Sequence, residues 1–257
     1  NVPILEYYWD FSGAIGGSTY TDSVKGIVAT MMSGNGGGLP QRSATGVTMV
    51  GTGPISSTSH SGGFLELALG GETLGGPMTI AIVGKWSAFN WFSRLFECGN
   101  GAGQDNIYVT AKGSSGQLRW QVSSGATARM ADSPGTSDLV AGVWYHIVVT
   151  VSGTTMISYI DGVKMGEELS GWEPTAVPRS QCYIGKSISA NDGYLSGEVS
   201  SLKIYSGAMT QDQVTAEFVG GVGGTASQTI QAGGVVTFTK TTASGRICWT
   251  TGATGTP

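Results

Sequence analysis

Two pairs of oxygen-bearing side chains are the residues of this chain best suited to hold a metal ion. Asp105-Asn106 and Asn191-Asp192 each stand in a polar loop that contains glycine. Calcium takes about six to eight oxygen ligands, and two such loops side by side can supply them. These four residues are therefore predicted calcium ligands. The alternative is ordinary turn chemistry, for which Asn-Asp-Gly is equally suited.

Aromatic residues in two polar loops are the candidates for carbohydrate binding. Sugar rings present apolar C–H faces and hydroxyl edges, so they bind flat aromatic side chains that lie beside polar groups. The segment KWSAFNWFSR supplies Phe89, Trp91 and Phe92, and Trp172 lies in the sequence SGWEPT. The alternative is that these aromatics close the open ends of a β-sandwich.

Catalytic groups do not pair in this sequence. Retaining glycosidases hold two carboxylates about 5 Å apart, whereas the best-placed acids here stand singly: Glu66, Glu97, Asp161 and Glu198. His60 lies in a polar loop and His146 alternates with core residues, and no G-x-S-x-G elbow exposes a serine. The chain is therefore predicted not to be an enzyme.

The three cysteines leave two interpretations open. Cys98 follows a buried-looking strand and Cys182 begins another, so a disulfide can join them if their α-carbons lie within about 7 Å. Cys248 would then be left over, either as a free thiol or paired beyond this segment. The alternative is that all three are small buried hydrophobes.

The elements that must position these residues are mostly strands. Residues 196–205 alternate polar and apolar side chains with period two, which predicts a half-buried strand. Thr210 and Gln213 then form a capping box, which predicts a short helix that turns Val214 and Phe218 inward.

The order strand, acidic loop, strand and capped helix in residues 183–218 resembles the closing part of the laminin G-like and pentraxin group. This group belongs to the concanavalin A-like lectin and glucanase superfamily of jelly rolls. Further segments resemble its opening motif, two early strands and central hairpin: residues 8–12 with 22–26, 78–86, 95–99 and 143–162. The resemblance implies an all-β fold, an antiparallel two-sheet jelly-roll sandwich, over residues 1–220.

The resemblance also bears on the candidate sites. GAGQDNIYV, with Asp105 and Asn106, resembles a pentraxin loop that supplies metal ligands, and Asn191-Asp192 falls where the second acidic loop of that family lies. Laminin G-like relatives often hold an ion near the positions of Asp10 and Asp22, which are expected here to make local turn hydrogen bonds. The Glu-x-Asp-x-x-Glu spacing of the glucanases in this superfamily is missing.

Composition agrees with a large all-β domain outside the nucleic-acid-binding and membrane-spanning classes. The chain has 257 residues, 43 of them glycine, and 12% charged residues, which suits many short strands joined by tight turns. A net charge of -4 offers no basic stripe for phosphates. No apolar run approaches the roughly 20 residues of a membrane span. The initial Asn1 fits either a fragment boundary or a secreted protein whose signal peptide was removed.

The C-terminal part is expected to be separate from the sandwich. Residues 221–233 read as a glycine-rich linker, and the strand-like runs 234–240 and 246–251 predict a β-hairpin tail. Because a lone hairpin is marginal in water, residues 234–257 are interpreted as the incomplete start of a second β module. GRICWTTGATGTP resembles a turn of small β-sandwich modules appended to carbohydrate-active enzymes, although the usual Asp is absent.

Two classes of function follow. The resemblance implies a non-catalytic, secreted recognition module that binds glycans or glycoproteins with the help of calcium. The alternative is a structural subunit of an extracellular filament or cell-surface coat, which packs against copies of itself or neighbouring domains of a longer chain. The low charge supports this alternative, because a surface of small side chains suits lateral packing and the attachment of O-linked sugars.

Overall fold

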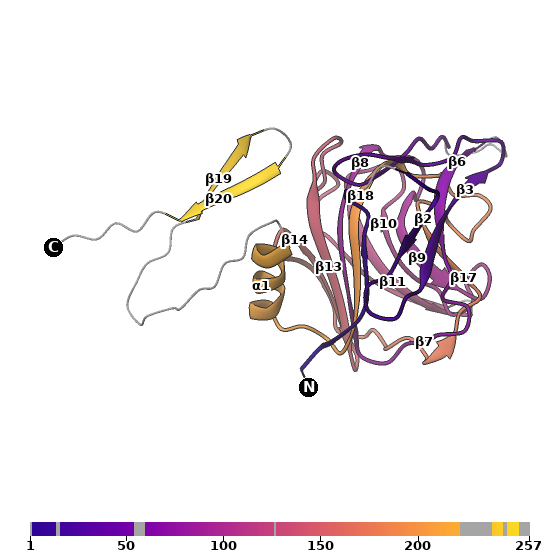
Figure 1. Cartoon of the computed structure of the whole chain (residues 1–257). Coiled ribbons are helices and arrows are strands. Elements are labelled where there is room, and N and C mark those ends of the chain that lie inside the picture. Colours follow the sequence, from indigo (N-terminus) through magenta and orange to yellow (C-terminus); the bar gives the residue numbers. More distant parts are fainter. Residues whose placement is uncertain are drawn as a thin grey trace.

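Two antiparallel sheets of eight strands each stack as a β-sandwich (Figure 1). The computed structural model describes residues 2–13, 16–53, 60–125 and 127–221, together with two strands near the C-terminus. The architecture confirms the predicted all-β jelly roll. Its core lies between the sheets, where alternate side chains of both meet, among them the fully buried Trp9, Trp86 and Trp120.

Sheet A is built around the long central strand pair of β8 and β18. Its order is β15 (Val163–Glu168), β14 (Thr155–Ile160), β13 (Tyr145–Ser152), β8 (Met78–Ala88), β18 (Ser196–Ser206), β5 (Val47–Met49) and β4 (Gln41–Arg42), and β1 (Ile4–Asp10) also pairs with β18. β13 and β14 form the predicted central hairpin. The predicted strand 196–205 is thus confirmed, with a register shift between Val199 and Ser201.

Sheet B carries the loops that hold most of the candidate site residues. Its order is β12 (Thr127–Asp132), β11 (Leu118–Ser124), β10 (Ile107–Ala111), β9 (Arg94–Gly99), β17 (Gln181–Ile184), β6 (Gly62–Leu67), β3 (Val28–Gly34) and β2 (Thr19–Thr21). The short strands β7 (Thr73–Leu74) and β16 (Val177–Pro178) pair with each other outside both sheets.

The helix α1 (Gln211–Gly221) lies on the outer face of sheet A, beside β13 and β14 in Figure 1. The capping box is confirmed, since the Thr210 amide donates to Gln213 Oε1 at 2.9 Å and the Gln213 amide donates to Thr210 Oγ1 at 3.4 Å. Val214 and Phe218 are buried as predicted. Packing against the sheet therefore stabilises a helix that is too short to persist alone.

Cys98 and Cys182 form the predicted disulfide. They are directly opposed on the neighbouring strands β9 and β17, with their α-carbons 4.1 Å apart and an S–S distance of 2.08 Å. Both sulfurs lie in the core between the sheets. The bond joins two strands that are 84 residues apart in sequence.

The two C-terminal strands β19 (Phe238–Ala243) and β20 (Arg246–Thr251) pair antiparallel as a hairpin. The second strand has the predicted bounds 246–251. The first was predicted over 234–240; residues 234–237 lie outside the described residues, and β19 continues beyond the predicted end to Ala243. Gly221 ends α1, and the rest of the predicted linker 221–233 lies outside the described residues. The side chain of Cys248 lies outside them as well.

Candidate functional site

The outer face of sheet B carries a row of polar and aromatic side chains. Strand register places six residues side by side, one on each of six neighbouring strands: Met130, Gln121, Tyr108, Glu97, Tyr183 and Glu66. Their sequence neighbours on these strands, apart from Arg129, lie in the core, so the six point away from it. At about 4.8 Å per strand the row is about 24 Å long. We name these six residues the outer-face row.

The loop between β8 and β9 brings Trp91 and Phe92 to the rim of this row. The two rings meet edge-on with centroids 5.0 Å apart. The Phe92 ring lies 5.8 Å from the guanidinium carbons of both Arg94 and Arg119. Trp91 lies against the β10–β11 turn, where a Cβ on Gly113 would come within 3.3 Å of its ring. Both aromatics are half-buried, and together they border the β10–β12 part of the outer face.

Phe92 adopts a backbone conformation that is unusual for a bulky residue. Its φ is +46°, in the left-handed region that mainly glycine and asparagine occupy. Two hydrogen bonds hold this conformation: the Phe92 amide donates to the Gly113 carbonyl at 2.8 Å, and the Phe92 carbonyl accepts from Arg94 Nη1 at 2.7 Å. Such strain is frequent at functional sites and costs about 1–3 kcal/mol. The conformation therefore indicates that this loop is a candidate functional site.

Phe89 and Trp172, the other two predicted sugar-binding aromatics, do not join this surface. Phe89 packs on the core with its ring centroid 6.1 Å from that of Trp86. Trp172 packs on the core and under Arg129, 4.7 Å from its guanidinium carbon. The amide of the neighbouring Gly171 donates to a carbonyl in the β13–β14 turn. Strand register places this turn beside the start of β8, whereas the loop that carries Phe89 follows the end of β8. Phe89 and Trp172 thus cover opposite ends of the sandwich.

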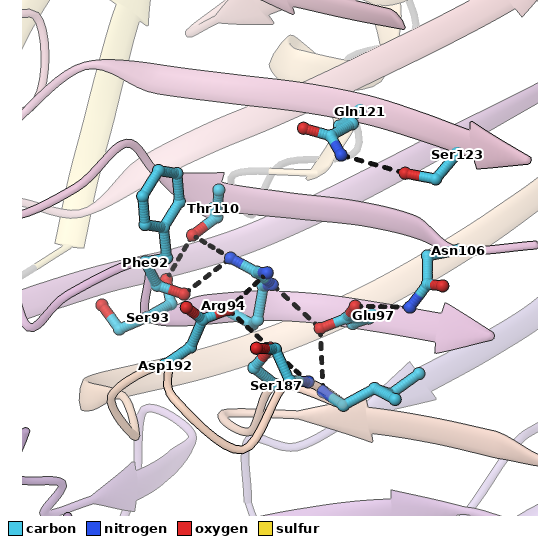
Figure 2. Close-up of polar contacts among 12 residues, drawn as sticks. Phe92, Ser93, Arg94, Glu97, Asn106, Thr110, Gln121, Ser123, Ser187 and Asp192 are labelled. Carbon is cyan, nitrogen blue, oxygen red and sulfur yellow. Dashed lines mark hydrogen bonds and ion pairs between the residues drawn. The ribbon is translucent and has the colours of Figure 1, made fainter. Parts of the chain in front are cut away.

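Arg94 is the centre of a buried polar network on the same face (Figure 2). Its side chain is only 4% exposed. Nε donates to Glu97 Oε2 at 2.9 Å, and Nη2 donates to Asp192 Oδ2 at 2.8 Å. The guanidinium also lies over the Tyr108 ring, 3.9 Å from its centroid. Burial raises the pKa of Tyr108 to about 12, so this phenol keeps its proton at neutral pH. Arg94 therefore ties the loop after β17 to the middle of sheet B.

Asp105 and Asn106, two of the predicted calcium ligands, have separate partners. Asp105 has a φ of +55° and its carboxylate accepts from Asn100 Nδ2 at 3.4 Å. Asn106 is 2% exposed and donates from Nδ2 to Glu97 Oε1 at 2.8 Å. The Asn106 Oδ1 atom has no partner. It is the one oxygen of this pair that is buried and free to accept.

Asn191 and Asp192, the other predicted calcium ligands, have partners different from those of Asp105 and Asn106. Asn191 is exposed, and Asp192 Oδ2 accepts from Arg94 and, at 2.8 Å, from the Ser187 hydroxyl. Burial raises the pKa of Asp192, while Arg94 opposes the shift. Within the described ranges no three His, Cys, Asp or Glu side chains gather where they could hold a metal. As arranged, the four residues do not fit a calcium shell, because the positively charged guanidinium of Arg94 already binds the Asp192 carboxylate.

Calcium binding by these loops stays a prediction that thermal melting can test. The sequence pattern predicts that 5 mM calcium raises the melting temperature by several degrees, because a ligand that binds only the folded state stabilises it by mass action. The Arg94 arrangement predicts no shift. Magnesium at equal concentration controls for ionic strength, and Asp105→Asn should remove any shift that the Asp105 loop causes.

Asp10 and Asp22 have the local roles expected of them. The buried Asp22 carboxylate accepts from the amides of Tyr8 at 2.5 Å and Lys25 at 2.6 Å. Asp10 accepts from the Ser12 amide at 2.9 Å. These contacts tie β1 to the turn after β2.

Sequence reasoning missed several residues of this face and the burial of His60. The alternation within β10 indicates on which face of that strand Tyr108 lies, and the alternation within β11 does the same for Gln121. Only the pairing of the two strands brings these side chains together. His60, predicted in a polar loop, is 5% exposed and lies 6.1 Å from the Tyr194 ring. The polar residues around His60 in the sequence give no sign of this contact with Tyr194.

The stacked jelly-roll sheets place this protein in the concanavalin A-like class of β-sandwiches. The sequence profile described as "Concanavalin A-like lectin/glucanases superfamily", a laminin G type, matches residues 60–215. The chain belongs to this family. No curated protein matches the sequence.

Solved structures share the fold at low sequence identity. Domain 4 of AbnA, a GH43 extracellular arabinanase from Geobacillus stearothermophilus in complex with arabinotriose, is 17% identical, with a TM-score of 0.60 over 83% of this chain and 98% of that domain. Trypanosoma rangeli sialidase is 17% identical, with a TM-score of 0.54 over 84% of this chain and 33% of the sialidase. At this identity the likeness concerns the fold. No helix among the described residues is long and apolar enough to cross a membrane.

Proposed function

We propose that this protein is a non-catalytic module that recognises glycans, free or on glycoproteins, outside the cell. The observation that carries the proposal is the half-buried pair Trp91 and Phe92 at the rim of the outer-face row, beside the half-buried Arg119 and Met130. The middle of the row, from Gln121 to Tyr183, is buried and supports this rim from below. Aromatic rings beside amide, carboxylate and guanidinium groups suit the apolar faces and hydroxyl edges of sugars. The arabinanase domain of the same fold is in complex with arabinotriose, which supports the proposal by analogy of fold.

The β10–β12 end of the row is the part best suited to hold a sugar. Gln121 donates from Nε2 to the Ser123 hydroxyl at 2.9 Å, which leaves its carbonyl oxygen as an acceptor. Arg119 forms a two-pronged pair with Asp132, with both contacts at 2.8 Å, and Lys112 pairs with the same carboxylate at 2.9 Å. Met130 is half-buried beside them. Fixed donors and acceptors of this kind can pair with the hydroxyl groups of a sugar.

The carboxylates of this face do not favour catalysis. Glu97 is 1% exposed, and both Glu97 and Asp192 bind Arg94. A glycosidase needs one protonated and one ionised carboxyl group on either side of an accessible bond. Buried carboxylates that share one guanidinium do not meet this need, which supports the non-catalytic role.

The disulfide and the sequence pattern bear on the proposed location and on calcium assistance. The disulfide supports an oxidising compartment such as the extracellular space, because such bonds are rare in the cytosol. Calcium assistance rests on the sequence pattern alone. The alternative role, a structural subunit of a filament or cell coat, predicts ordered self-association and no glycan binding.

Phe92→Gly is expected to lower glycan affinity at least tenfold, with the free energy of unfolding changed by less than about 1 kcal/mol. Glycine removes the ring from the rim and relieves the left-handed backbone, so the relief offsets the lost packing. A glycan array identifies the ligand, and calorimetry with that ligand measures the affinity.

Phe89→Leu is the matched control, because Phe89 lies in the same loop but packs on the core; it should keep full affinity. Equal affinities of Phe92→Gly and the wild type would contradict the proposed face. An empty array together with concentration-dependent assembly in sedimentation would favour the structural subunit.

A further inference from the structure

A groove of about 250 Å³ lies on the outer face of sheet A, beside the C-terminal end of α1. Its floor consists of small side chains from adjacent strands. Ser201 of β18 is opposite Val83 of β8, and Ala81 lies two residues further along β8. Because these side chains are short, they leave space above the sheet, and α1 forms one side of that space. The groove therefore follows from the choice of residues at three strand positions.

The walls of the groove carry four groups that can form hydrogen bonds. Tyr8 and Lys203 are opposite each other on β1 and β18, and the Lys203 ammonium lies 5.1 Å from the centre of the Tyr8 ring. Glu217 of α1 accepts from Lys203 Nζ at 2.6 Å. His146 of β13 forms the remaining wall, with its ring 5.7 Å from that of Phe218.

The charges of the groove cancel. Lys203 and Glu217 form an ion pair, and the Tyr205 hydroxyl donates to the second Glu217 oxygen at 2.9 Å. Burial lowers the pKa of His146 to about 4, so its ring is neutral at physiological pH. An ionic ligand would be desolvated without a free countercharge. A neutral ligand with hydroxyl groups can instead donate to Glu217 and accept from Lys203, Tyr8 or Ser201.

One buried nitrogen atom in the groove wall lacks a hydrogen bond within the described part of the chain. His146 Nδ1 is buried and has no hydrogen-bond partner among the described residues. Buried nitrogen atoms normally have a partner. The His146 ring lines the groove, so a ligand hydroxyl beside it is a candidate partner for this imidazole.

We propose that this groove is a second ligand site, which takes a single neutral, hydroxyl-bearing ring such as one monosaccharide unit. Its volume lies below the range of about 300–1,000 Å³ that drug-sized ligands fill, so an oligosaccharide would extend out of it. The site lies on sheet A, whereas Trp91, Phe92 and the outer-face row border sheet B. The proposal therefore does not depend on the function proposed for sheet B.

The test is an NMR titration of the full chain with methyl glycosides of glucose, galactose, mannose, xylose and arabinose. We expect at least one of them to cause saturable shifts of amides in β18 and the last turn of α1, with a dissociation constant in the millimolar range. Methyl glucuronide should bind at least tenfold more weakly. The affinity should be equal at pH 5.5 and 7.5, because His146 stays neutral at both.

Ser201→Leu fills the floor and should abolish these shifts. Thr155→Leu, at a half-buried position near the opposite end of sheet A, is the matched control and should keep them. Tyr8→Phe, which removes only a hydroxyl, should weaken binding several-fold. This variant tests the groove if Ser201→Leu fails to fold. The absence of saturable shifts with all five glycosides, or shifts that Phe92→Gly removes and Ser201→Leu keeps, would overturn the proposal.

Discussion

Replacing Arg179 by methionine is expected to lower the free energy of unfolding by about 3–5 kcal/mol. Arg179 is 1% exposed, and its guanidinium donates to four backbone carbonyls: Leu74, Asp105, Thr175 and Val177. These carbonyls belong to three separate segments around the β7–β16 pair and the loop before β10. A buried acceptor that loses its donor costs about 1–3 kcal/mol. Methionine fills the space but offers no donor, so several of these acceptors are left unpaired.

The loss at Arg179 should be the same at pH 5 and pH 7.5. Burial lowers the pKa of Arg179, and the nearby Asp105 opposes this shift, yet the guanidinium stays charged throughout this range. Its hydrogen-bond partners are carbonyls, which do not titrate. Urea unfolding at both pH values measures the loss directly.

Arg129→Met is the matched control for Arg179→Met. The Arg129 guanidinium bonds to the carbonyls of Ser170 and Ala128 near the surface, so its loss should cost less than about 1 kcal/mol. Equal losses in the two variants would show that the Arg179 carbonyls find other donors.

Local signals in the sequence were sufficient to predict several of the elements. The Thr210–Gln213 capping box and the alternation in β18 are properties of contiguous residues, so they could be predicted directly. In both cases the physical cause lies within a few residues of the signal. The sequence allowed the pairing of Cys98 with Cys182 but did not decide it, because the two residues are 84 apart and only the pairing of β9 with β17 brings them together.

The candidate site depends on register and loop placement, which single residues do not reveal. Trp91 and Trp172 both stand in polar loops, and only the pairing of β8 with β13 sends them to different ends of the sandwich. Arg94 meets Asp192 across 98 residues of sequence. That contact requires the loop after β17 to fold over sheet B, and no motif in either segment predicts it.

Replacing Arg94 by methionine is expected to cost about 3–5 kcal/mol at pH 7.5, because it leaves the Glu97 and Asp192 carboxylates buried without their cation. Unlike the loss at Arg179, this loss should shrink as the pH falls. Burial raises the pKa of Asp192 in the folded wild type, and Arg94 opposes the rise. Without Arg94 the pKa of Asp192 rises further above its value in the unfolded chain.

The sign of the pH effect follows from proton linkage. A carboxyl group whose pKa is higher in the folded state binds protons more tightly there, so acid stabilises the fold and this stability is lost as the pH rises through the folded pKa. The difference between wild type and Arg94→Met should therefore be smaller at pH 5 than at pH 7.5 in urea unfolding. Asp192→Asn added to Arg94→Met should recover part of the loss at pH 7.5. A loss that stays constant with pH, as expected for Arg179→Met, would mean that water or a displaced loop neutralises Asp192 once Arg94 is gone.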